Sequence, residues 1–114
     1  MASRQAKLVD LLDKKQREGK LSWETTEKVK IFQTAFTDYS VRITERRNEN
    51  GADDIFISVF NEEGDLLEEF SDLSVGSELP RAYETMSRLY ESARREALGV
   101  DKALDSLLDE LTKL

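Results

Sequence analysis

The side chains that most often carry out catalysis are missing from this sequence. It contains no histidine and no cysteine. Histidine is the usual general base near neutral pH, and both residue types are common metal ligands and members of nucleophilic triads. Their absence excludes Cys/His hydrolases, disulfides and zinc sites built on thiolates or imidazoles. We therefore expect a protein that is not an enzyme, with no catalytic residue, no cofactor and no bound metal.

Carboxylates are the most abundant groups that remain, but their spacing does not favour a catalytic or metal site. The segment 61–65 is acidic, yet a calcium loop needs about twelve residues and a distal glutamate, so a hairpin turn is the favoured interpretation. Two pairs of adjacent acids, Asp53–Asp54 and Glu68–Glu69, lie in stretches with strand-like patterns. Successive strand residues point to opposite faces, so neither pair converges on one substrate atom.

Charge is distributed unevenly along the chain. The formal net charge is −7, and residues 51–79 carry nine acidic and no basic side chains. A negative field opposes direct binding to nucleic acid, which depends on neutralised phosphates. The acidic segment supports an alternative role, that of a decoy or inhibitor that binds a basic groove of a nucleic-acid-handling protein. The residues proposed for that role are Glu62, Glu63, Glu68 and Glu69.

Arginines from two parts of the chain raise a second binding possibility. They could join into a basic patch for phosphate or an acidic partner, or they could pair with neighbouring carboxylates such as Glu45, Glu84 and Glu91. We favour pairing. The arginines concerned are Arg42, Arg46, Arg47, Arg88, Arg94 and Arg95.

The period of the hydrophobic pattern predicts the elements that position these groups. Residues 3–18 repeat at helical spacing, with Ser3 as a cap and Gly19 as a stop. The period then changes to two, which predicts an antiparallel meander with turns at Thr37–Asp38, Asn50–Gly51 and 62–65. The expected strands are 21–24, 32–36, 39–44, 55–60 and 66–70, the fourth central and the last at an edge.

The last third of the chain is predicted to be helical. After a loop at 71–79, Pro80 falls in the first turn of a long helix that ends at Gly99. Asp101 can cap a final helix. We expect one α+β domain over residues 1–114, in which a short N-terminal helix precedes a meander of three to five strands and two C-terminal helices pack on one face of the sheet.

The final helix has the most suggestive pattern. Apolar residues recur at a four-three-four-three spacing, as in a coiled coil. Such a stripe is buried either within the same chain or against another subunit or partner, and a homodimer is one option. The residues are Val100, Leu104, Leu107, Leu111 and Leu114, with Leu108 beside them.

Two stretches of the chain resemble known sequences. Asp38–Ile43 (DYSVRI) and Ala93–Leu104 (ARREALGVDKAL) are similar to recurrent segments in a family of small uncharacterised bacterial proteins. In that family a short helix precedes a tryptophan-bearing strand, a meander and two closing helices. The resemblance implies this fold and a bacterial or phage origin, and it implies no activity.

These observations together favour a non-catalytic protein-interaction or regulatory module. Its partner would be a protein or a second copy, without direct contact to nucleic acid, membrane or a small-molecule substrate. No apolar run approaches the ~20 residues of a membrane helix, and the first residues lack the apolar stretch of a secretory signal. We therefore expect a cytoplasmic protein. An enzyme that relies on carboxylates and magnesium is the least favoured hypothesis.

Overall fold

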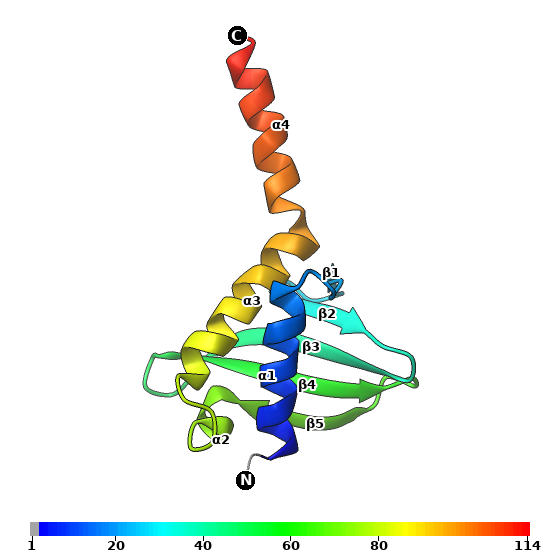
Figure 1. Ribbon diagram of the computed structural model, residues 1–114, viewed down its shortest axis with the longest axis vertical. Coiled ribbons are helices and arrows are strands. Elements are labelled where there is room, and N and C mark those ends of the chain that lie inside the picture. Colours follow the sequence, from blue (N-terminus) through cyan, green and yellow to red (C-terminus); the bar gives the residue numbers. More distant parts are fainter. Residues whose placement is uncertain (1–2) are drawn as a thin grey trace.

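The computed structural model describes residues 3–114, and its elements follow the predicted order (Figure 1). The α+β class, the N-terminal helix and the antiparallel sheet are confirmed. The elements are α1 (Arg4–Arg17), β1 (Glu24–Thr25), β2 (Ile31–Ala35), β3 (Tyr39–Arg47), β4 (Asp53–Asn61), β5 (Leu66–Ser71), α2 (Asp72–Val75), α3 (Ala82–Leu98) and α4 (Val100–Thr112).

The five strands form a meander in the order β1-β2-β3-β4-β5, with every neighbouring pair antiparallel. The turns between β3 and β4 and between β4 and β5 use Gly51 and Gly64, at φ angles of 82° and 87°. Glycine adopts this left-handed region at little cost, which is why the two turns were predictable from sequence. As predicted, β4 is an interior strand and β5 is an edge.

One face of the sheet is covered by α1 and α3, which cross it side by side (Figure 1). The core between these layers contains Ile43 and Ile57 from the sheet, Val9 from α1, and Met86 and Leu89 from α3. Burying one such side chain contributes roughly 1.5–3 kcal/mol. Alternation along the strands therefore supplies one apolar face to the helices and leaves the other face open.

Polar contacts attach the two covering helices to each other. The Asp13 carboxylate of α1 is buried, and its Oδ2 lies 3.0 Å from the Arg88 guanidinium of α3. Trp23 adds a second connection, because its indole N–H donates to Gln16 at 2.7 Å and its backbone N–H donates to Glu96 at 2.6 Å. Because Glu96 takes that N–H, β1 begins only at Glu24, later than the expected strand 21–24.

Two other boundaries differ from the sequence prediction. Part of the expected loop 71–79 is the short helix α2, which Ser71 caps, and its buried Asp72 accepts the backbone N–H of Ile55 at 2.8 Å. Pro80 precedes α3 instead of lying in its first turn, because Arg81 is in a left-handed conformation (φ 57°) and the helix starts at Ala82.

The start of α4 also differs from the prediction. Gly99 has a φ of 66° and separates α3 from α4, so it occupies the capping position that was assigned to Asp101. Asp101 lies inside the helix and pairs with Arg95 of α3. A left-handed residue at this point redirects the chain.

Of the two C-terminal helices, α3 packs on the sheet and α4 projects away from it (Figure 1). All α4 residues from Asp101 to Thr112 are exposed. The molecule measures 56 × 34 × 29 Å and its radius of gyration is 15.7 Å, against about 13 Å for a compact domain of this length. The projecting helix accounts for this elongated shape.

Within residues 3–114, no helix combines the length and the apolar character that crossing a bilayer requires.

Candidate interaction surfaces

The largest apolar feature outside the core is a row of leucines on α4, called the leucine stripe here. Four of its members are 47–63% exposed and the last is 99% exposed. None packs back on the sheet, so the structure leaves the stripe open to solvent. The stripe consists of Leu104, Leu107, Leu108, Leu111 and Leu114.

Few interactions within α4 stabilise the helix that carries the leucine stripe. It has 13 residues, and an isolated helix of about 12–15 residues is marginal in water. An ion pair between Lys113 and Asp109 (3.0 Å) lies near its end, and exposed pairs of this kind contribute only about 0.3–0.5 kcal/mol. Packing against another surface is the usual source of stability for such a helix.

The four glutamates proposed for an acidic decoy do not form one surface. Glu62 and Glu63 lie together in the turn between β4 and β5. Glu69 is aligned with Ser58 on the open face of the sheet, whereas Glu68 is aligned with Val59 on the other face. The structure therefore brings the first two acids together and separates the last two.

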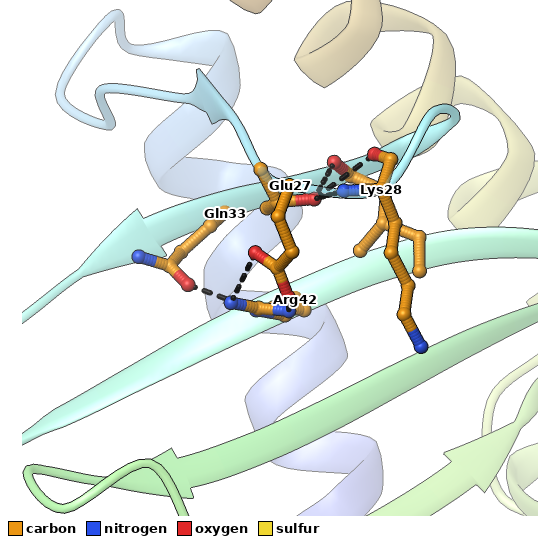
Figure 2. A network of polar contacts seen from close by, with 6 residues as sticks. Glu27, Lys28, Gln33 and Arg42 are labelled. Carbon is orange, nitrogen blue, oxygen red and sulfur yellow. Dashed lines mark hydrogen bonds and ion pairs between the residues drawn. The ribbon is translucent and has the colours of Figure 1, made fainter.

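Arginines cover aromatic rings on the open face of the sheet. Arg42 lies over Phe60 at 5.1 Å from the ring centre, and Arg46 lies over Phe56 at 4.5 Å. Figure 2 shows Arg42 between its two partners: it donates to Gln33 at 2.9 Å and to both oxygens of Glu27 at 2.9 and 3.3 Å. The side chain is thereby held flat against the sheet.

Arg46 is held in the same way by Glu69. Its two terminal nitrogens donate to the two carboxylate oxygens at 2.9 and 3.0 Å, and Ser58 donates to Glu69 at 2.7 Å. These hydrogen bonds, the one from Arg46 first, lower the pKa of Glu69 below its ordinary value. Bidentate arginine–carboxylate pairs have a fixed geometry, so this face is ordered and its charge is neutralised locally.

The arginine pairing predicted from sequence is confirmed, although the partners differ in part. Glu91 pairs with Arg94 as expected and Glu84 pairs with Arg81, whereas Glu45 pairs with no arginine within residues 3–114. Contacts between strands, loops and helices, which the sequence pattern does not reveal, bring the other carboxylates close. The remaining pairs are Arg42–Glu27, Arg46–Glu69, Arg47–Asp53, Arg88–Asp13 and Arg95–Asp101.

Comparisons with known proteins assign no family to this arrangement. No family model, no curated protein and no solved structure matches the chain. The resemblance to small bacterial proteins stays a prediction. In the part of the chain that the structure describes, no three carboxylates are grouped so that they could hold a metal ion.

Sequence reasoning missed an apolar groove beside the start of α4. It has a volume of about 420 Å³ and lies between the loop that joins β1 to β2 and the last turns of α3. Val29, Phe32 and Leu98 supply its apolar surface, and basic side chains stand at its rim. Residues from these two regions are about 65 positions apart in sequence, so no local pattern predicts the groove. The charged residues that line the groove are Lys28, Lys30 and Arg94, together with the acidic Glu27.

Hydrogen bonds give the loop of this groove a defined shape. Lys30 has a left-handed backbone (φ 69°), a conformation that costs a side-chain-bearing residue of order 1–3 kcal/mol. Its carbonyl accepts the hydroxyls of Thr44 at 3.1 Å and Tyr90 at 3.2 Å. Burial raises the pKa of the Tyr90 hydroxyl above its ordinary value. The Thr26 hydroxyl also bonds to the loop backbone.

Proposed function

We propose that this protein is a non-catalytic protein-interaction module and that α4 is its docking element. The observation that carries the proposal is the leucine stripe, which lies exposed on a helix outside the core. Large exposed apolar patches on soluble proteins commonly mark interaction sites.

The arrangement of the stripe matches the way helices dock. Leu104, Leu107 and Leu111 alternate in steps of three and four, which places them on one side of a helix. Leu108 widens this side beyond the two-position pattern of a coiled coil, toward the broader face by which a helix packs in a bundle or lies in an apolar groove. Polar residues occupy the opposite side, as a solvated face requires.

The acidic-decoy alternative has weaker support. It needs a continuous negative surface, but Glu68 and Glu69 lie on opposite faces of the sheet and Glu69 is paired with Arg46. Within residues 3–114, the members of the proposed set that form no ion pair are Glu62 and Glu63 in the turn and the separate Glu68, and these do not make one surface. The two proposed functions predict different salt dependences of binding, because an electrostatic interface weakens as ions screen it.

A comparative pull-down from the native host tests the proposal. Tagged wild-type protein and the variant Leu107→Glu/Leu111→Glu are used as baits, and the eluted complexes are weighed by native mass spectrometry. We expect a stoichiometric complex with the wild type, whether with another protein or with a second copy, and its loss with the variant. Two buried glutamates would oppose docking.

Ser106→Glu is the matched control, because it adds charge to the polar side of the same helix. We expect this control to keep the complex, and both variants to retain the wild-type melting temperature. A wild-type bait that elutes alone as a monomer, or a complex that survives the stripe substitutions, contradicts the proposal. Survival of that kind combined with dissociation at moderate salt favours the decoy instead.

A further inference from the structure

We propose that the partner of the leucine stripe is a second copy of this chain. In this dimer the two α4 helices run antiparallel, and the tip of each helix, at Leu114, docks in the groove beside the start of the other. The inference rests on the proposed function and names its partner. In the proposed dimer the two copies contact each other through the leucine stripe and the groove, which both lie outside the core.

The lengths of the elements favour the antiparallel pairing. Leu98 lines the groove and is followed at once by Gly99 and α4, so the groove lies at the base of the helix. A 13-residue helix extends about 20 Å. If Leu104 packs against Leu107 of the second copy, the tip at Leu114 reaches the end of the second copy's α3, beside its groove. A parallel pair would bring the two tips together, far from both grooves.

Charge complementarity supports the same arrangement. Within residues 3–114, neither Lys28 nor Lys30 forms an ion pair with a carboxylate, although both stand at the rim of the groove. Glu110 also lacks a cationic partner among these residues and flanks the stripe near its tip. The C-terminal end of a helix carries partial negative charge. Antiparallel docking therefore brings an acidic helix end to a groove at which two lysines have no carboxylate partner among residues 3–114.

The groove also supplies area that the helices alone lack. From Val100 to Leu114 the repeat covers only about two heptads, whereas a stable interface buries about 800 Å² on each partner. Val29 is 88% exposed on the loop that the Tyr90 and Thr44 hydroxyls hold in place. A loop that is already ordered loses little freedom on binding, so this side chain is a suitable contact for the arriving tip.

The proposed dimer has closed two-fold symmetry. Each copy contributes one stripe and one groove, so a two-fold axis pairs both at once and leaves neither of them open to a further copy. We therefore expect a discrete dimer and no larger assembly.

Sedimentation velocity over a range of protein concentrations measures the dimer. We expect a reversible monomer–dimer equilibrium for the wild type, and a dissociation constant raised about tenfold or more by Val29→Glu. Leu73→Glu is the control, because Leu73 is 72% exposed on α2, at the opposite end of the molecule from α4 (Figure 1). This control should leave the dissociation constant unchanged.

A charge exchange tests the contact between tip and rim. Lys28→Glu and Glu110→Lys should each weaken the dimer, and the double variant Lys28→Glu/Glu110→Lys should recover most of the wild-type affinity. Neither residue belongs to the core, so both single variants should keep the wild-type melting temperature at protein concentrations where the wild type is monomeric. Additive losses in the double variant would overturn this contact.

Because the chain has no cysteine, cross-linking can report the orientation of the helices. In a mixture of Leu98→Cys and Leu114→Cys under mild oxidation, we expect the mixed disulfide to dominate. Rapid disulfide formation by Leu114→Cys alone would show a parallel pair and overturn the groove docking. A dimer that depends on Leu107 but ignores Val29→Glu would overturn it as well.

The failure of this inference can be told apart from failure of the proposed function. A wild-type protein that stays monomeric at every concentration overturns the second copy as partner. If the pull-down then still shows a stoichiometric complex that Leu107→Glu/Leu111→Glu abolishes, α4 remains a docking element for another protein. If no complex depends on the stripe, both proposals fail together.

Discussion

The sheet and α4 differ in how far their apolar side chains are exposed to solvent. One face of the sheet is buried under α1 and α3, and on the other face Arg42 and Arg46 lie over the rings of Phe60 and Phe56. The leucines of α4 have no such cover. Both elements show a regular apolar pattern in the sequence. Most apolar side chains of the sheet are covered, with exceptions such as Leu66 and Leu67, whereas the leucines along α4 are all exposed.

An exposed face is not necessarily available for binding. On the sheet, the carbon atoms and guanidinium planes of the arginines shield the rings, and Glu27 and Glu69 neutralise the charge that this brings. On α4 the polar residues lie on the other side of the helix and leave the leucines free. A row of exposed leucines therefore lies on the helix that projects from the domain.

The sharpest test compares equivalent truncations in the two regions. Ile57→Ala in β4 should lower the free energy of unfolding by about 2–5 kcal/mol, because Ile57 is fully buried and its truncation leaves a cavity. Leu107→Ala in α4 should change it by less than about 0.5 kcal/mol in dilute protein, because Leu107 is 55% exposed. Urea denaturation measures both. A large loss from Leu107→Ala would mean that α4 packs on its own domain.

Removing an arginine should expose an aromatic ring on the open face of the sheet, as the leucines are exposed on α4. Arg46→Ala deletes the cover of Phe56 and the pair with Glu69, and we expect a loss of about 1 kcal/mol and stronger binding of a hydrophobic dye. Arg47→Ala is the control: it removes an exposed pair with Asp53, and no ring contact of Arg47 is seen among residues 3–114. Equal effects of the two variants would show that the stacking has no shielding role.

The pH-dependent contribution of Glu69 to stability should be the smallest of these effects. The hydrogen bond from Arg46 lowers the pKa of Glu69 in the folded state, relative to an ordinary value of 4.5. A lowered pKa stabilises the fold above the unfolded-state value, and this contribution disappears as the pH falls through the folded-state value. Glu69→Gln should therefore be destabilising by a few tenths of a kcal/mol near neutral pH and without effect well below pH 4.5.

Glu68→Gln provides the comparison for this titration, because Glu68 lies on the other face of the sheet and forms no ion pair with residues 3–114. Thermal melts of both variants at several pH values measure the difference. A constant effect of Glu69→Gln at all pH values would show that the Arg46 pair contributes nothing.

Much of the fold was predictable because local patterns carry it. Alternation identified the strands, and Gly51 and Gly64 marked turns because they adopt positive φ angles that other residues avoid. Two of the boundary errors occurred where a distant group intervened. Trp23 is drawn out of β1 by Glu96, and α2 is held at the sheet by the contact of Asp72 with Ile55. Such contacts join residues far apart in sequence, and no local window contains both members.

The candidate surfaces, too, were predictable only in part. The leucine stripe of the last helix follows from the amino-acid sequence alone, because a 3.6-residue period gathers Leu104, Leu107 and Leu111 on one side. Periodicity reports which side is apolar and says nothing of what covers it. The tertiary structure decided that point: Gly99 turns α4 away from the domain, and the loop at Val29 meets the end of α3 to form the groove. Both outcomes depend on the spatial relation of elements, which only the packed chain defines.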